Sequence, residues 1–285
     1  MKLSDFFAAL FRWPRRKPQP EPDPDPVLPA ESRRVEYGND PMQYVTLDLP
    51  ARRKSERVRV FLIVHGGGWW QGDADAPNVV DAKVAWLNPQ GIALGSISYR
   101  LGTKSTPRIG PDMEADDVAA AVAYLRAHAD ELGIDADRIV LAGHSAGGHL
   151  SALGITRLGV TVAGFVGLDS ACYNVVQAME GPHPEDPFGI AFGEDPAFWE
   201  ECCPTANMTK TPPPMLLAAS TQRGPANIPQ AEAFARKAIG FDGRAEVYQA
   251  ALEHGEVNSL LGTTDTPEAA ALTAKVQAFV DSVIG

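Results

Sequence analysis

The sequence has no hydrophobic run long enough to cross a membrane, and it has little cysteine. A membrane-spanning helix needs about 20 consecutive apolar residues, and the 285-residue chain contains no such stretch. The three cysteines are Cys172, Cys202 and Cys203. An odd number of cysteines, two of them adjacent, does not fit a disulfide framework or a zinc motif. We therefore expect free, at least partly buried thiols and no metal site.

Basic residues are in the minority. The chain carries 25 Lys and Arg against 36 Asp and Glu, a formal net charge of −11. Phosphate binding needs clustered Lys and Arg, so we do not expect nucleic acid as a partner. The composition, with 45% hydrophobic and 21% charged residues, is that of an ordinary globular domain. The length is sufficient for one large core or two small ones.

Carboxylates are missing from one long internal segment. Residues 204–231 contain neither Asp nor Glu. The segment includes an apolar strand-like run, Met215 to Ala219. The sequence AASTQRGPANIPQ, residues 218–230, continues from the end of this run into a loop. Any acidic group that acts at the end of this strand must therefore come from another part of the chain.

The N-terminal residues 1–32 are rich in proline, and we expect a disordered tail. Its first part, Phe6 to Trp13, is a short amphipathic stretch followed by three basic residues. It is too short for a secretory signal, and its positive charges lie on the wrong side, so we expect a cytoplasmic protein. The alternative role for this stretch is a weak contact with a membrane surface.

From residue 33 to the end, predicted strands and helices alternate. Strands are expected at 44–49, 58–64, 92–99, 138–142, 162–168, 215–219 and 245–251, and helices at 116–128, 147–153, 230–239 and 267–283. This alternation predicts an α/β fold with a mostly parallel sheet and helices on both faces. Residues 170–212 interrupt the pattern, and we expect a small cap insertion there. In such folds the functional site lies at the carboxyl ends of the strands.

Gly143-His-Ser-Ala-Gly147 matches the pattern G-x-S-x-G between a predicted strand and a predicted helix. In that context the pattern forms a sharp turn that exposes the serine as a nucleophile. Ser145 is the candidate nucleophile. Ala146, at the start of the helix, is expected to donate its N–H to an oxyanion, and His144 to line the substrate pocket.

His65-Gly-Gly-Gly-Trp69 follows the strand at 58–64. An HGGG loop at this place supplies the second half of an oxyanion hole, and we expect N–H donors from Gly66 and Gly67. His65 is expected to brace the loop. The following Trp69 and Trp70 line the substrate pocket or only pack the loop, and the sequence leaves both open.

His254 follows the last predicted strand and is the candidate general base. The other histidines fit this role less well. His128 is on a helix, His144 and His149 are next to the nucleophile in sequence, and His183 is in the cap.

These motifs resemble those of the α/β-hydrolase superfamily. HGGGWWQGD, ISYR and GHSAGGHL are similar to motifs in hormone-sensitive-lipase-like esterases, feruloyl-esterase-like proteins and kynurenine formamidases. The resemblance extends from about residue 33 to the end and implies the α/β-hydrolase fold, with Ser145 as nucleophile and His254 as base. It does not supply the acid, because the usual position aligns near Arg223.

The acid must then be found from the topology. Asp169 ends the strand that follows the nucleophile strand, and Gly167-Leu-Asp-Ser-Ala171 is similar to the acid-bearing turn of pancreatic-type lipases. Glu256, two residues after His254, is the rival. We prefer Asp169. Arg223 either pairs with a cap carboxylate such as Glu185 or Asp186 or contacts an acidic substrate.

The sequence thus predicts a carboxylesterase-like serine hydrolase that acts on small to medium esters, with no cofactor. Two alternatives stay open at this point. One is an amidase of the kynurenine formamidase type, and the other is a catalytically silent binding protein on the same fold.

Overall fold

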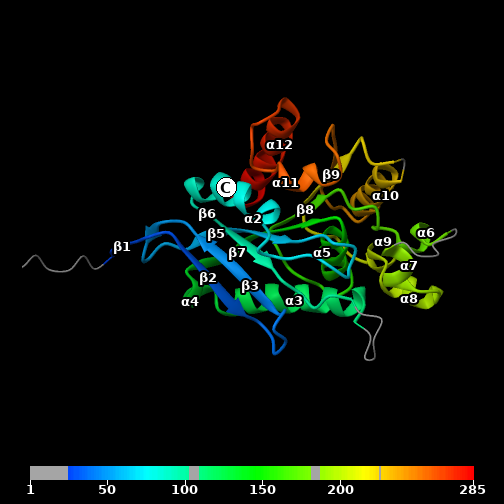
Figure 1. The fold of residues 1–285 in the computed structure, drawn as a ribbon, viewed down its shortest axis with the longest axis horizontal. Coiled ribbons are helices and arrows are strands. Elements are labelled where there is room, and N and C mark those ends of the chain that lie inside the picture. Colours follow the sequence, from blue (N-terminus) through cyan, green and yellow to red (C-terminus); the bar gives the residue numbers. More distant parts are fainter. Residues whose placement is uncertain (1–24, 103–108, 181–186, 225) are drawn as a thin grey trace, which may run out of the picture.

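The computed structural model describes residues 25–102, 109–180, 187–224 and 226–285. Strands and helices alternate around one central sheet (Figure 1). The strands of this sheet are β2 (Glu31–Glu36), β3 (Tyr44–Leu49), β5 (Val58–Val64), β6 (Ile92–Ile97), β7 (Ile134–His144), β8 (Gly164–Leu168), β9 (Met215–Ser220) and β10 (Ala245–Ala250). The longer helices are α2 (Pro77–Leu87), α3 (Pro111–Ala127), α5 (Ala146–Thr156), α10 (Asn227–Gly240) and α12 (Pro267–Ile284).

The sheet is mostly parallel, as the sequence predicts. Among the described residues its strand order is β10-β9-β8-β7-β5-β6-β3-β2. The strands from β6 through β5 to β10 pair in parallel, while β3 is antiparallel to β6 and β2 is antiparallel to β3. The chain goes from β5 to β6 in one direction and later from β7 to β10 in the other. A functional site in such a sheet is expected where the strand order reverses, which is between β5 and β7.

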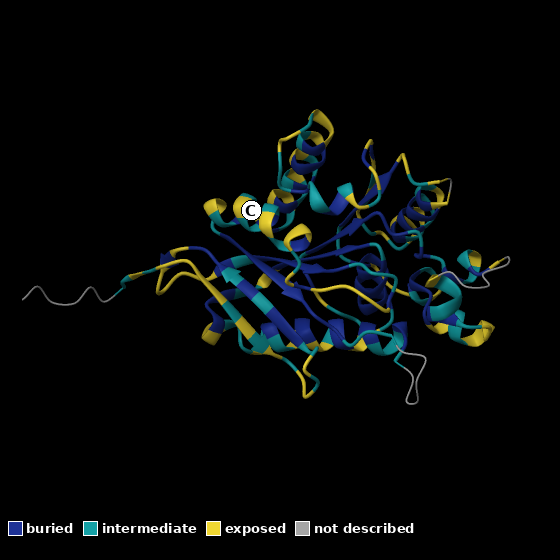
Figure 2. Ribbon diagram, in the orientation of Figure 1, coloured by how far each residue is buried: buried dark blue, intermediate teal, exposed yellow. Residues whose placement is uncertain are grey.

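Both faces of the sheet are buried under helices. Along β5, Val60, Leu62 and Val64 belong to one apolar core, and Phe61 and Ile63 belong to the other. Successive side chains of a strand point to opposite faces, so a continuous apolar run indicates a strand that is covered on both sides. The first core includes residues of α3, α5 and α10, and the second includes residues of α2 and α12. Figure 2 shows the central strands as buried throughout.

The edge of the sheet at β2 was not predicted, because its residues are mostly polar. β2 is exposed or half-buried along its whole length, so it has no apolar pattern to signal a strand. Just before β2 in the sequence, β1 (Val27–Leu28) forms a short antiparallel pair with β4 (Arg52–Arg53), which follows β3. The folded part therefore begins before residue 33, the predicted boundary. Residues 1–24, which contain the amphipathic stretch from Phe6, lie outside the described residues.

Between β8 and β9 the chain forms short helices, where the sequence predicts a cap. They are α6 (Val175–Ala178), α7 (Pro187–Phe192), α8 (Pro196–Glu201) and α9 (Pro204–Asn207). Figure 1 places them together at one end of the molecule, next to α10. The remaining short elements are α4 (Ala129–Leu132), α11 (Glu256–Ser259) and the 3-10 turn η1 (Asn88–Gln90).

Cys172, Cys202 and Cys203 are all buried, and none of them forms a disulfide bond. In the described part of the chain, no helix is both long and apolar enough to span a membrane.

Candidate active site

Ser145 lies in the sharp turn between β7 and α5. Its backbone has φ 54° and ψ −119°, a conformation that is strained for a residue other than glycine. The flanking glycines have no space for a side chain. A Cβ on Gly143 would lie 2.2 Å from the Gly147 carbonyl oxygen, and one on Gly147 would lie 2.2 Å from the Val64 carbonyl oxygen. The G-x-S-x-G pattern is thus required by close backbone approach on both sides of the serine.

His254 follows β10 and reaches Ser145 from the far end of the sheet. Its Nε2 lies 3.0 Å from the Ser145 Oγ, and its Nδ1 lies 2.6 Å from Asp169 Oδ2. The carboxylate only accepts hydrogen bonds, so Nδ1 carries the proton and Nε2 is free to accept one from the serine. This is the arrangement that a general base needs.

Asp169 follows β8, next to the nucleophile strand, with a left-handed φ of 51°. Its Oδ1 accepts hydrogen bonds from the Ser220 N–H at 2.8 Å and from Asn227 Nδ2 at 2.7 Å. Burial favours the neutral acid, but the hydrogen bonds from His254, Ser220 and Asn227 and the charge of Arg223 outweigh it, so the pKa of Asp169 is lowered. Asp169 is therefore an anion that faces the protonated nitrogen of His254.

Arg223 lies on the loop after β9 and contacts the same aspartate. Its Nη1 donates to the Asp169 carbonyl oxygen at 2.6 Å and is 3.4 Å from Asp169 Oδ2. Glu185 and Asp186, its predicted cap partners, lie outside the described residues. The loop that lacks a carboxylate thus provides donors to the carboxylate of the neighbouring strand. Sequence reasoning missed Ser220 and Asn227, because a backbone N–H and an isolated asparagine give no pattern.

Glu256, the predicted rival, makes a different contact. Its Oε2 accepts the backbone N–H of Glu253 at 2.9 Å, which closes the turn that carries His254. In the described part of the chain, Asp169 is the carboxylate that contacts the His254 ring.

The HGGG loop lies beside Ser145 because β5 and β7 are neighbours in the sheet, with Val64 paired to Gly143. Among the described residues, the N–H groups of Gly66, Gly67 and Ala146 have no hydrogen-bond acceptor. His65 stacks on the Tyr99 ring with centroids 4.4 Å apart, and the Tyr99 hydroxyl donates to the His65 carbonyl at 2.9 Å. These contacts brace the loop that holds the free N–H groups.

The two tryptophans after the loop have different surroundings. Trp69 is buried, and its Nε1 donates to His149 Nδ1 at 3.1 Å. His149 Nε2 in turn donates to the Cys202 carbonyl at 2.7 Å, which links the loop to the cap. Burial lowers the pKa of His149 to about 4, so its ring is neutral. Trp70 is 46% exposed at the rim of the site.

His144 packs directly against the candidate base. Its ring is 4.6 Å from the His254 ring, and its Nε2 donates to the His254 carbonyl at 2.9 Å. Burial, with a smaller contribution from His254, lowers the pKa of His144 to about 3. A neutral His144 therefore supports the turn of His254 without adding a charge.

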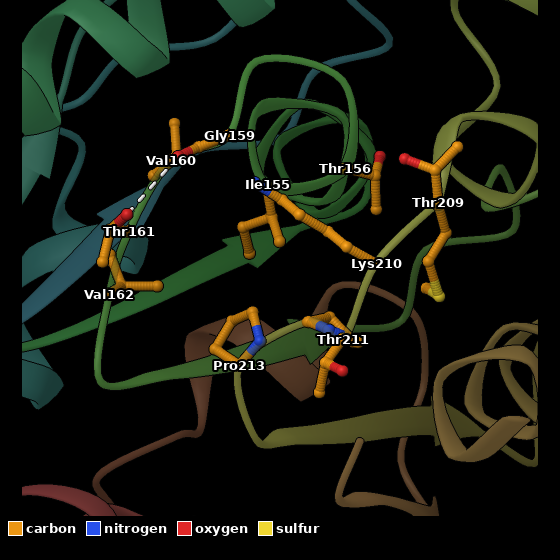
Figure 3. Close-up of a pocket in the computed structure, with 12 residues that line it drawn as sticks. Ile155, Thr156, Gly159, Val160, Thr161, Val162, Thr209, Lys210, Thr211 and Pro213 are labelled. Carbon is orange, nitrogen blue, oxygen red and sulfur yellow. Dashed lines mark hydrogen bonds between the residues drawn. The ribbon is translucent and has the colours of Figure 1, made fainter. Parts of the chain in front are cut away.

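Most of the predicted site residues line one cavity of about 580 Å³, whereas Asp169 and Ala146 are not part of its lining. Its lining includes His65 through Trp70, His144, Ser145, Phe188, Arg223 and His254. A separate cavity of about 340 Å³ lies between the end of α5 and the segments before β8 and β9 (Figure 3), and no predicted site residue lines it. Among the described residues, no group of three or more His, Cys, Asp or Glu is placed to hold a metal ion.

The chain is similar in sequence to known esterases. The BD-FAE family model matches residues 46–172. Esterase LipC of Mycobacterium tuberculosis is 33% identical over 149 residues, which cover 52% of this chain and 36% of that protein. Carboxylesterase NlhH of the same species is 37% identical over 98 residues, covering 34% of this chain and 29% of that protein. The chain spans about a third of the length of these curated relatives.

Solved structures show the same fold over most of the chain. Esterase 2 of Thermogutta terrifontis, phosphonylated by sarin, aligns with a TM-score of 0.71 at 19% identity, covering 88% of this chain and 95% of that one. The butyrate-bound form of that esterase aligns with a TM-score of 0.69 at 20% identity, covering 88% and 94%. The chain therefore has the α/β-hydrolase fold, and part of it is similar in sequence to carboxylesterases.

Proposed function

We propose that the chain is a serine hydrolase that cleaves carboxylic esters of small to medium acyl or aryl substrates through an acyl-enzyme. One observation carries the proposal. Ser145 Oγ, His254 Nε2 and Nδ1, and Asp169 Oδ2 form one continuous hydrogen-bonded series, with separations of 3.0 and 2.6 Å. The sequence similarity to esterases supports the same activity.

In the first half of the reaction, Ser145 Oγ attacks the ester carbonyl carbon while His254 Nε2 takes the hydroxyl proton. The imidazolium that forms is stabilised by Asp169, which is already ionised. The carbonyl oxygen becomes an oxyanion and accepts hydrogen bonds from Gly66, Gly67 and Ala146, whose N–H groups are free. His254 then gives its proton to the leaving alcohol, and the acyl group stays on Ser145.

In the second half, a water molecule replaces the alcohol. His254 Nε2 takes a proton from the water, and the resulting hydroxide attacks the acyl carbon. The second oxyanion accepts hydrogen bonds from the same N–H groups. Collapse of this intermediate releases the carboxylic acid and returns the proton to Ser145. Apart from the ester and this water molecule, each reacting group in the sequence belongs to the chain.

The cavity sets the size of the substrate. A volume of about 580 Å³ suits a small to medium ester. Its walls include the aromatic side chains of Trp69, Trp70 and Phe188, which favour apolar acyl or aryl groups.

The test is hydrolysis of 4-nitrophenyl acetate and butyrate by the wild type and by Ser145→Ala. We expect turnover by the wild type and a loss of roughly 10⁶-fold in kcat for the variant, the order found for removal of a nucleophilic serine. Ser151→Ala is the matched control, because Ser151 is a buried serine on α5, the helix that follows Ser145, and its hydroxyl has no hydrogen-bond partner among the described residues. Equal activity of wild type and Ser145→Ala contradicts the proposal.

A further inference from the structure

Arg223 lies where two cavities meet. One is the cavity that contains Ser145 and His254. The other, of about 590 Å³, is lined by α6, the start of α10 and the loop after β9. Both linings include Arg223 and Phe188. A substrate that extends from Ser145 into the second cavity has to pass these two side chains.

The arginine is held in place but keeps free donors. Its Nη1 is fixed by the carbonyl and carboxylate oxygens of Asp169. In the described part of the chain, its Nε and Nη2 have no acceptor, and its side chain is 28% exposed. A guanidinium has five N–H donors in a rigid fork. A fixed arginine with an unused edge is suited to bind a carboxylate in a bidentate way.

Arg223 is also the one lysine or arginine among the described residues that line either cavity. Two carboxylates, Asp73 and Glu180, belong to these linings, and both are exposed. Exposed charges are screened by water and salt more than a half-buried one is. Asp169 shares the charge of Arg223, but its side chain is buried and lines neither cavity, so Arg223 is the cationic group that a ligand at the junction meets.

We propose that Arg223 binds a carboxylate group of the substrate, so that the preferred substrates are esters that carry a free carboxylate. This inference rests on the proposed ester hydrolysis. It assigns Arg223 two contacts, with Asp169 through Nη1 and with the substrate through Nε and Nη2. A purely structural Arg223 would affect anionic and neutral esters alike, whereas a substrate-binding Arg223 affects their ratio.

The experiment compares kcat/KM for matched pairs of anionic and neutral esters. Monomethyl succinate, glutarate and adipate are measured against the methyl esters of butyrate, pentanoate and hexanoate, which places the charge on the acyl side. 4-Acetoxybenzoate against methyl 4-acetoxybenzoate places the charge on the leaving group. Proton release reports hydrolysis of all of them.

For at least one pair the wild type should prefer the anionic ester. In Arg223→Met this preference should fall about 10- to 100-fold, the size of a charge-assisted hydrogen bond, mainly through KM. Arg223→Lys keeps the charge and should retain part of the preference. Arg236→Met is the control, because it removes an exposed arginine on α10 that pairs with Glu232 and lines neither cavity, and it should leave the preference unchanged.

Three results overturn the inference. If Arg223→Met lowers activity equally on both members of every pair, or if the wild type prefers every neutral ester, Arg223 only positions Asp169 and the ester hydrolysis stands. If the wild type cleaves none of these esters and no 4-nitrophenyl ester, the proposed function fails and the inference fails with it.

Discussion

The substitution Asp169→Asn separates the charge of the carboxylate from its shape. In the wild type, Asp169 Oδ1 accepts from the Ser220 N–H and from Asn227 Nδ2, while Oδ2 faces His254 Nδ1 at 2.6 Å. An asparagine keeps its oxygen toward the two donors, so its NH₂ group faces His254. The backbone remains favourable, because asparagine tolerates a left-handed φ such as 51°.

The NH₂ group donates to His254 Nδ1 and moves the ring proton to Nε2, which faces Ser145. That tautomer cannot take the serine proton. In a serine-protease triad the corresponding change lowers kcat by about 10⁴, and we expect a similar loss here. A factor of 10⁴ corresponds to about 5 kcal/mol of transition-state stabilisation.

The assay is kcat for 4-nitrophenyl acetate, together with thermal unfolding to show that the variant is folded. Asp242→Asn is the matched control, because Asp242 also has a left-handed φ, of 60°, and no part in the site. Glu256→Gln should stay within a few-fold of the wild type, since Glu256 contacts the Glu253 N–H. A loss below tenfold in Asp169→Asn, or a large loss in Glu256→Gln, refutes the assignment of the acid.

Three further substitutions test buried groups around the site. Burial lowers the pKa of Lys83 to about 7, so the unfolded chain binds more protons than the folded one between about pH 7 and 10 and stability rises with pH there. The free energy of unfolding of Lys83→Met should therefore exceed that of the wild type most below pH 7, and this excess should disappear toward pH 10. Denaturant unfolding that gives the same difference in free energy at pH 6 and at pH 9.5 would contradict this. Burial, with a smaller contribution from the charge of Asp117, raises the pKa of Glu114 well above its usual value. The wild type should therefore lose stability as pH rises above about 4.5, so the stability of Glu114→Gln relative to it should increase by up to about 1.4 kcal/mol per pH unit in the same measurement; a difference independent of pH would refute the shift. Trp69→Phe leaves the buried His149 Nδ1 without its donor and should cost about 1–3 kcal/mol in unfolding free energy, and a stability equal to the wild type would show that this hydrogen bond is not formed.

The sequence predicted the central strands and four of the five longer helices, α3, α5, α10 and α12, because their patterns have a direct physical cause, whereas α2 (Pro77–Leu87) was not predicted. The apolar run of β5 follows from burial on both faces of the sheet. Glycine is required at 143 and 147 because neighbouring backbone atoms lie so close that there is no space for a Cβ. The exposed strand β2 has neither signal, and its pairing with β3 is determined by tertiary structure.

The candidate site was predictable to the extent that topology places residues together. Parallel strands bring their carboxyl ends to one edge of the sheet, so Ser145, Asp169 and His254, which follow β7, β8 and β10, had to lie near one another. The contact of Arg223 with Asp169 was not predictable, because it depends on the path of the loop after β9. The same holds for Asn227, which completes the hydrogen bonds of Asp169 from the first turn of α10.

The most direct test of the account is labelling by a fluorophosphonate, which reacts with an activated serine. The wild type should form one adduct, located on Ser145 by peptide mass spectrometry, and Ser145→Ala should form none. Asp169→Asn should label far more slowly than Asp242→Asn, because its His254 cannot activate the serine. A folded wild-type protein that is not labelled, or that is labelled at another residue, would contradict the central claim that Ser145, His254 and Asp169 act as one catalytic unit.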